Sequence, residues 1–192
     1  MRKISVFNFI SVDGYYAGPG GDISWAKARQ DDEQDPEESD FGRKGVGAGN
    51  ILLFGRITYE MMAGYWPSPM AMKNSPEMAE GMNKAEKIVF SRTLKKAAWN
   101  NSRIAGGEMV EAIRKLRQEP GKDMTVLGSG SIVTQLAQEG LIDEYQLMIH
   151  PVVLGKGSSI FGGVSRQLDL ELTATRSFTS GVVLLCYRPV KN

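Results

Sequence analysis

Short apolar segments recur along the chain and predict most of its strands. Residues 4–12 are rich in β-branched and aromatic side chains, which favours a buried first strand that stops at Asp13-Gly14. Three later apolar runs, each followed by Gly or Ser, lie at residues 51–54, 87–90 and 124–127. Continuous short runs of this kind are typical of strands buried on both faces of a sheet.

The C-terminal part shows two other strand patterns. Residues 145–150 alternate between apolar and polar positions, which predicts a half-buried strand. Residues 168–188 predict two strands joined at Ser180-Gly181. Such a hairpin pairs its two strands antiparallel.

The segments between these strands carry helix signals. Pro36, followed by Glu37 and Glu38, predicts a helix start with Asp35 as the N-cap and an end near residues 45–47. Cap residues or 3.6-residue apolar spacing predict further helices over residues 58–62, from residue 75 onward, and over residues 108–118 and 131–138.

Strands that alternate with helices, followed by a terminal hairpin, predict an α/β fold. We expect three α/β/α layers, in which a mixed, mainly parallel sheet has helices on both faces and an antiparallel edge at the C-terminal hairpin. No linker divides the 192 residues convincingly, so residues 1–192 are predicted to form a single domain. The segment Gly18-Pro19-Gly20-Gly21 predicts a mobile loop.

Composition excludes several function classes. With a net charge of +1 and no basic block, the chain does not match a nucleic-acid-binding protein. No apolar run approaches the ~18 residues of a membrane helix, and the first residues do not resemble a signal peptide, so we expect a cytoplasmic protein. The only cysteine, Cys186, is predicted to be a buried thiol, and the only histidine, His150, does not suffice for a metal site.

Polar and glycine residues follow three of the predicted strands directly. These are Gly55-Arg56 with Thr58, Ser91-Arg92, and Gly128-Ser129-Gly130-Ser131. Because the carboxyl ends of parallel strands share one edge of a sheet, we expect the three groups to lie together. Glycine N–H groups, hydroxyls and arginines suit phosphate, and two arginines suggest a dinucleotide, with or without a 2′-phosphate. The alternative is that the glycines only serve the turns and the arginines are ordinary surface charges.

Four motifs occur in an order that resembles the dihydrofolate-reductase-like superfamily. They are Leu53-Phe54-Gly55-Arg56-Ile57-Thr58-Tyr59-Glu60, Ile88-Val89-Phe90-Ser91-Arg92-Thr93-Leu94, Val126-Leu127-Gly128-Ser129-Gly130-Ser131 and Pro151-Val152-Val153-Leu154-Gly155-Lys156-Gly157. The opening Ser11-Val12-Asp13-Gly14 and Ala17-Gly18 belong to the same pattern. The chain is similar in particular to stand-alone proteins related to the reductase (C-terminal) domain of the bifunctional riboflavin-biosynthesis deaminase-reductase.

The resemblance implies NADPH as the cofactor. Its phosphate and adenosine contacts would come from residues at the strand ends: Gly55, Arg56, Thr58, Ser91 and Arg92. The pyrophosphate would also bind at a helix start formed by Gly128, Ser129, Gly130 and Ser131. Ala17 and Gly18 would lie beside the nicotinamide, on a loop able to close.

For the substrate the resemblance is looser. Riboflavin-pathway reductases usually carry a lysine where this chain has Tyr15, and Gly47-Ala48-Gly49-Asn50 also departs from their pattern. The implied substrate contacts are Asp13 and Trp66. Trp66 and its neighbour Tyr65 either stack on a planar heterocycle or seal the core.

Dihydrofolate reductases place a carboxylate on the first helix, where it assists protonation of the pterin. Asp40, fifteen positions before Gly55, falls roughly there, with Glu37 and Glu38 as competitors. Asp40 is alternatively a solvated charge near the start of its helix. His150 is either a general acid or a histidine that is satisfied at a strand end.

From these observations we expect an NADPH-dependent reductase that transfers hydride to a pyrimidine- or pteridine-type substrate. The substrate class nearest to the resemblance is that of 5-amino-6-(5-phosphoribosylamino)uracil reductase in riboflavin biosynthesis. Dihydrofolate-like pterin reduction is one alternative, and a non-catalytic module that binds NADPH or another nucleotide is the second. The resemblance also implies a homodimer, and from the charge and the apolar runs we expect neither nucleic acid nor a membrane as a partner.

Overall fold

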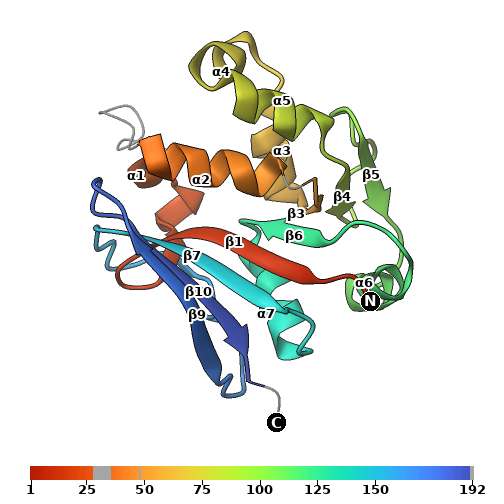
Figure 1. Ribbon diagram of the computed structural model, residues 1–192. Helices are drawn as coiled ribbons and strands as arrows, with labels where there is room; N and C mark the ends of the chain where they lie inside the picture. The colour runs from red at the N-terminus through yellow and green to blue at the C-terminus, as the bar shows by residue number, and fades with distance from the viewer. Residues whose placement is uncertain (28–35, 48, 191–192) are drawn as a thin grey trace. The chain divides into compact units, whose positions relative to one another are not determined.

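The computed structural model describes residues 1–27, 36–47 and 49–190 (Figure 1). Asp35, the predicted N-cap, and Ala48 lie outside the described residues. The chain divides into two compact units, which are described separately below. The first unit comprises Met1–Lys3 and Asp40–Ser129, and the second comprises Ile4–Ser39 and Gly130–Asn192.

The first unit contains four parallel strands. They are β3 (Ile51–Gly55), β4 (Lys87–Phe90), β5 (Ser102–Ala105) and β6 (Met124–Leu127). Their order is β5-β4-β3-β6, and every neighbouring pair is parallel. The three apolar runs predicted as strands are therefore confirmed and adjacent. The sequence pattern missed β5, which has a single large apolar residue, Ile104, and lies at the edge.

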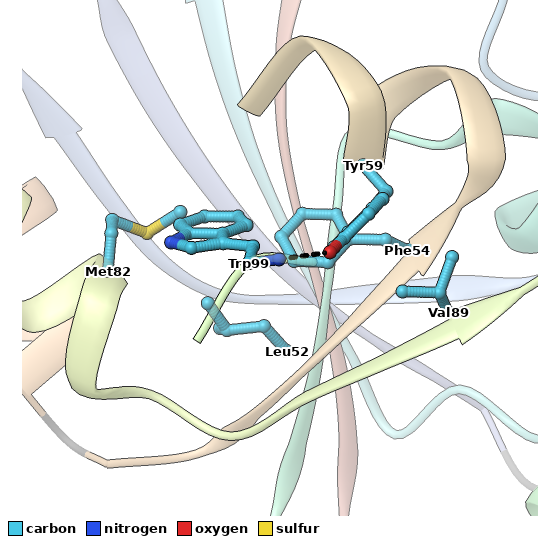
Figure 2. Packing of buried hydrophobic residues seen from close by; sticks show 6 residues of the cluster. All are labelled: Leu52, Phe54, Tyr59, Met82, Val89 and Trp99. Atoms are coloured by element: carbon cyan, nitrogen blue, oxygen red, sulfur yellow. Dashed lines mark hydrogen bonds between the residues drawn. The ribbon is translucent and has the colours of Figure 1, made fainter. Parts of the chain in front are cut away.

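The first unit also has helices, two of which, at residues 56–65 and 76–84, supply residues to an aromatic core. The helices are α3 (Arg56–Tyr65), α4 (Pro69–Asn74), α5 (Pro76–Lys84) and α6 (Met109–Gln118). Figure 2 shows the buried cluster, which consists of Leu52, Phe54, Tyr59, Met82, Val89 and Trp99. The backbone N–H of Trp99 donates to the Tyr59 hydroxyl at 2.9 Å, so both the ring and the hydroxyl of Tyr59 fix α3.

The second unit contains a mixed set of strands. They are β1 (Ile4–Ser11), β7 (Glu144–His150), β9 (Leu170–Ser177) and β10 (Val183–Pro189), in the order β1-β7-β10-β9. The β1–β7 pair is parallel, whereas β10 runs antiparallel to both β7 and β9. The predicted C-terminal hairpin is thus confirmed. A separate antiparallel ribbon joins β2 (Tyr15–Ala17) to β8 (Ser158–Ser159) and was not predicted.

Three helices belong wholly or partly to the second unit. They are α1 (Ser24–Lys27), α2 (Pro36–Gly47), which continues into the first unit, and α7 (Gly130–Gln138). A helix over the predicted residues is confirmed from Pro36 onward. Between β2 and α1 a 3-10 turn, Pro19–Gly21, is closed by a 2.7 Å hydrogen bond from the Gly18 N–H to the Asp22 carbonyl. Mobility of this segment stays a prediction.

The fold is a mixed α/β fold with mainly parallel strands and an antiparallel C-terminal part, as predicted. Cys186 is buried, as expected, and burial raises the pKa of its thiol. In the part of the chain that the structure describes, every helix is too short or too polar to cross a bilayer.

Candidate functional site

The structure brings the three predicted strand ends together in the first unit. Because β4, β3 and β6 are parallel neighbours, Ser91, Gly55 and Gly128 lie at the carboxyl ends of adjacent strands. Ligands of open α/β sheets bind at this edge. The candidate phosphate-binding residues of this unit therefore form one group, as the sequence predicted.

A hydrogen bond joins the ends of β3 and β6. The backbone N–H of Gly55, the N-cap residue of α3, donates to the Ser129 hydroxyl at 3.0 Å. Gly128 and Ser129 both have left-handed backbone, with φ of 61° and 52°. A side chain at Gly128 would also meet Thr58, since an added Cβ would lie 3.2 Å from its Cγ2. The turn after β6 thus lies against the first turn of α3.

The two candidate arginines differ in their surroundings. Arg56 forms an exposed ion pair of 2.8 Å with Glu60, one turn further along α3. Arg92 is exposed and has no ion pair within the described ranges. The Ser91 hydroxyl accepts hydrogen bonds from the N–H groups of Thr93 and Leu94, so it fixes the turn that presents Arg92. Of the two, Arg92 is the guanidinium that is available to an anion.

In the second unit Asp13 ties two loops together. Its carboxylate accepts hydrogen bonds from the Ser11 hydroxyl and from the N–H groups of Leu154 and Gly155. These donors, Ser11 first, hold the pKa of Asp13 below its ordinary value. An ionised carboxylate with these partners is a structural anchor. Its predicted contact with substrate remains a prediction.

The residues predicted beside the nicotinamide lie in a tightly packed ribbon. Ala17 is buried. A Cβ added to Gly157 would lie 2.1 Å from the carbonyl oxygen of Ala17, so only glycine fits at position 157. Gly18 follows directly and opens the 3-10 turn. Also in this unit, Gly130 is the first residue of α7 and is buried, whereas Ser131 is exposed. Sequence patterns did not single out Tyr16, whose ring lies on Gly130.

The acidic candidates on α2 fall into two groups. Glu37 forms an ion pair with Arg176 of β9, and Glu38 accepts a hydrogen bond from the Ser180 hydroxyl at 2.8 Å. Both competitors of Asp40 thus hold the start of α2 to the C-terminal hairpin. Asp40 itself is half-buried, and its predicted proton-donor role stays a prediction.

His150 is buried among aromatic rings in the second unit. Its ring lies edge-on to Phe9 and Trp25, at centroid distances of 5.0 and 5.4 Å. His150 is the last residue of β7, and its role as a general acid or as a structural histidine stays a prediction. The sequence patterns missed Trp25, because one tryptophan on a four-residue helix has no periodicity to reveal it.

Trp66 packs on the core of the first unit. It lies half-buried beside the aromatic cluster, and its indole N–H contacts the Met62 sulfur at 3.0 Å. The Tyr65 ring stands edge-on to it at a centroid distance of 5.0 Å. These contacts support the interpretation that Trp66 seals the core, and substrate stacking is untested.

Comparison with known proteins shows the family to which the chain belongs. Residues 2–184 match the family described as the RibD C-terminal domain. The uncharacterized protein YyaP of Bacillus subtilis strain 168 is 31% identical over 186 residues, which cover 97% of this chain and 94% of YyaP. The resemblance inferred from the four motifs is therefore confirmed.

Solved structures show the same fold. A putative riboflavin biosynthesis protein from Shewanella sp. PV-4 matches with a TM-score of 0.76 and 21% identity, over 98% of this chain and 99% of that one. Dihydrofolate reductase from Enterococcus faecalis, complexed with NADP(H) and RAB-propyl, matches with a TM-score of 0.63 and 16% identity, over 98% and 97% of the chains. At these identities the likeness concerns the fold.

Proposed function

The chain belongs to the RibD C-terminal domain family, and we propose that it is an NADPH-dependent reductase. The observation that carries this proposal is the group at the strand ends of the first unit, where the Gly55 N–H donates to Ser129 beside Thr58. The fold shared with a dihydrofolate reductase complexed with NADP(H) supports it. We further propose that residues 1–192 act as one domain, in the cytoplasm and as a homodimer.

The residues of the first unit fit the phosphates of a dinucleotide. Exposed Arg92, on a turn fixed by Ser91, would contact the 2′-phosphate, and the turn at Gly128 and Ser129 would approach the pyrophosphate. Arg56 would assist only by leaving Glu60. In the second unit the N–H groups at the start of α7, at Gly130 and Ser131, suit a phosphate, and Ala17 and Gly18 would adjoin the nicotinamide.

NADPH, when bound, supplies hydride to an electrophilic carbon of the substrate. The protein's task is to orient the rings, exclude water and provide a proton. We propose Asp40, half-buried on α2, as the proton source, because the resemblance to dihydrofolate reductases implies a carboxylate at about this position. The substrate class that we favour is a ribosylamino-pyrimidine related to 5-amino-6-(5-phosphoribosylamino)uracil.

Two experiments test these proposals in turn. Calorimetric titration should give tight binding of NADPH and weaker binding of NADH, whereas no binding of either would refute the cofactor assignment. NADPH oxidation would then be followed with the aminopyrimidine and with dihydrofolate. Oxidation with the aminopyrimidine alone supports the riboflavin-type substrate, and oxidation with dihydrofolate alone refutes it. NADPH binding without turnover of either favours a nucleotide-binding module.

A further inference from the structure

The outermost strand of the second unit, β9, is exposed along its length (Figure 1). In the part of the chain that the structure describes, β9 has a strand neighbour on one side alone, which is β10. Every residue from Glu171 to Ser177 is exposed, and Leu172 exposes 49% of its surface. The other side of β9 therefore presents a row of N–H and C=O groups that suits another strand. Proline, lysine or a very short length usually protects such an edge, and the eight residues of β9 have none of the three.

A bulge in β9 places its two charged residues on one face. The register of β9 against β10 skips Thr173, which is an extra residue in β9. Because cross-strand partners share a face, Glu171 and Arg176 lie on the same face of the sheet. Without the extra residue, positions 171 and 176 would point to opposite faces. The other face is formed by Leu170, Leu172, Thr175 and Ser177.

The register also shows which backbone groups of β9 point outward. In an antiparallel pair, residues that exchange hydrogen bonds with the neighbouring strand alternate with residues whose N–H and C=O groups point away from it. At one end of the pair the Phe178 N–H donates to the Val182 carbonyl at 2.9 Å. At the other end the Val190 N–H donates to the Asp169 carbonyl at 2.8 Å. Counting inward from both ends, the outward groups belong to Leu170, Leu172, Thr175 and Ser177.

A second copy of β9 presents the same groups in a matching order. A two-fold axis perpendicular to the sheet makes the two strands antiparallel. In one register Leu172 lies opposite Thr175 of the second copy, and Leu170 lies opposite Ser177 of the second copy. Both members of each pair have outward backbone groups and share a face, so each pair can exchange two hydrogen bonds. The symmetry repeats both pairs beyond the axis, at which the two bulges lie.

The same register brings opposite charges together. Glu171 lies opposite Arg176 of the second copy, in a pair that exchanges no backbone hydrogen bonds and therefore holds its side chains close. Within the chain Glu171 forms an ion pair of 2.9 Å with Arg188, and Arg176 forms one with Glu37. The four charges would alternate in sign along one face of the paired strands. The edge is thus complementary to itself in charge as well as in hydrogen bonding.

We propose that β9 binds β9 of a second copy of this chain, antiparallel and with Glu171 opposite Arg176 of that copy. This inference rests on the homodimer that is part of the proposed function, and it is independent of the cofactor. It gives the dimer a defined interface, in which the strands β1, β7, β10 and β9 continue into those of the second copy. The bulge at Thr173 acquires a role, since it sets the register in which the two edges match.

Charge reversal tests the register. Glu171→Arg and Arg176→Glu each turn two attractions across the interface into repulsions, so each variant alone should raise the dimer dissociation constant about tenfold or more. In an equimolar mixture of the two variants, both contacts again join opposite charges. The heterodimer should therefore form within about fivefold of the affinity of the unchanged protein. Arg188→Glu breaks the same ion pair with Glu171 one strand further in, and as the control it should change the constant less than about threefold.

Thr175→Pro tests the backbone pairing. Proline at this position removes an N–H that points away from β10, so the hydrogen bonds between β9 and β10 are kept. The variant should sediment as a monomer and still melt cooperatively. Thr175→Val, which keeps the N–H, is the matched control and should remain a dimer.

Sedimentation equilibrium measures the dissociation constants, and native mass spectrometry identifies the heterodimer. A dimer that Thr175→Pro and both charge reversals leave intact would overturn this inference while the homodimer stands. Losses that mixing does not restore would mean that the charges act within each chain, which overturns the proposed register. A monomeric unchanged protein at about 100 μM would overturn the homodimer and this inference together. NADPH binding, which calorimetry measures separately, would not be affected by that result.

Discussion

The backbone N–H of Gly55 donates a 3.0 Å hydrogen bond to the hydroxyl of Ser129, 74 residues further along the chain. The bond fastens the turn after β6 to the start of α3, and Ser129 is buried. Ser129 also holds a left-handed φ of 52°, a conformation that costs a non-glycine residue roughly 1 kcal/mol or more. The bond from Gly55 is the contact that a serine, and not a glycine, supplies at this position.

Replacing Ser129 separates these two effects. Ser129→Ala removes the acceptor and keeps the strain, so we expect it to lower the free energy of unfolding by about 1–3 kcal/mol. Ser129→Gly removes both the acceptor and the backbone strain. It should therefore be more stable than Ser129→Ala, by about 1 kcal/mol. Both should weaken NADPH binding, and Ser75→Ala, at a residue of the first unit whose hydroxyl makes no cap hydrogen bond, is the control. Urea unfolding and calorimetry measure the two quantities, and wild-type values for Ser129→Ala in both would exclude a role for the hydroxyl.

We predict that the free energy of unfolding depends on pH through Lys87, a buried residue of the first unit. Its side chain is buried, donates to the carbonyls of Asn83, Ala85 and Asn100, and lies 4.3 Å from the centroid of the Trp99 ring. Burial lowers the pKa of Lys87 to about 8, from an ordinary value of 10.5. At pH values between these two pKa values, Lys87 binds more protons in the unfolded chain than in the folded one. The contribution of Lys87 to the free energy of unfolding therefore rises with pH.

The matched variant is Lys87→Met, which keeps most of the volume and has no proton to lose. The difference in unfolding free energy between protein and variant should be constant below about pH 8. From there to about pH 10, the unfolding free energy of the unchanged protein should rise relative to that of Lys87→Met. The rise should be at most about 1.4 kcal/mol per pH unit, which is the limit for one proton. Urea unfolding at pH 7, 8, 9 and 10 measures it, and a difference that falls over this interval would contradict the assignment.

Arg92 should discriminate between NADPH and NADH, because it is exposed without an ion pair in the described ranges, whereas Arg56 is paired with Glu60. Arg92→Ala should raise the dissociation constant of NADPH about tenfold and that of NADH less than twofold. Lys96→Ala, another exposed cation on the same segment, is the control. Equal losses for both nucleotides with Arg92→Ala would mean that Arg92 does not contact the 2′-phosphate.

Sequence patterns sufficed where local chemistry determines the structure. The apolar runs before Gly55, Ser91 and Gly128 predicted three strands, and the parallel pairing rule then placed their ends together. A helix after Pro36 followed from that proline and the acidic residues behind it. In each case the signal lies within a few residues of the element.

Contacts between distant segments could not be predicted in this way. The ribbon of Tyr15–Ala17 with Ser158–Ser159 is too short to show a period, and it forms because Gly157 lets two backbones meet. The resemblance assigned Asp13 to the substrate, yet its carboxylate binds the N–H groups of Leu154 and Gly155, more than 140 residues away. Side-chain partners at this separation depend on the whole fold.

Asp40 is the residue whose replacement should separate chemistry from binding. If it supplies the proton, Asp40→Asn should lower turnover about 100-fold, since positioned acids and bases typically contribute 10²–10⁴ in rate, and leave the NADPH affinity unchanged. Glu37→Gln and Glu38→Gln are matched controls on the same helix, because their partners are Arg176 and Ser180. They should alter turnover less than about threefold, since their contacts fasten α2 to the C-terminal hairpin and an exposed ion pair such as that of Glu37 contributes little. Single-turnover kinetics with saturating NADPH measures the effect. Unchanged turnover in Asp40→Asn, or an equal loss in either control, would mean that the proton comes from another group.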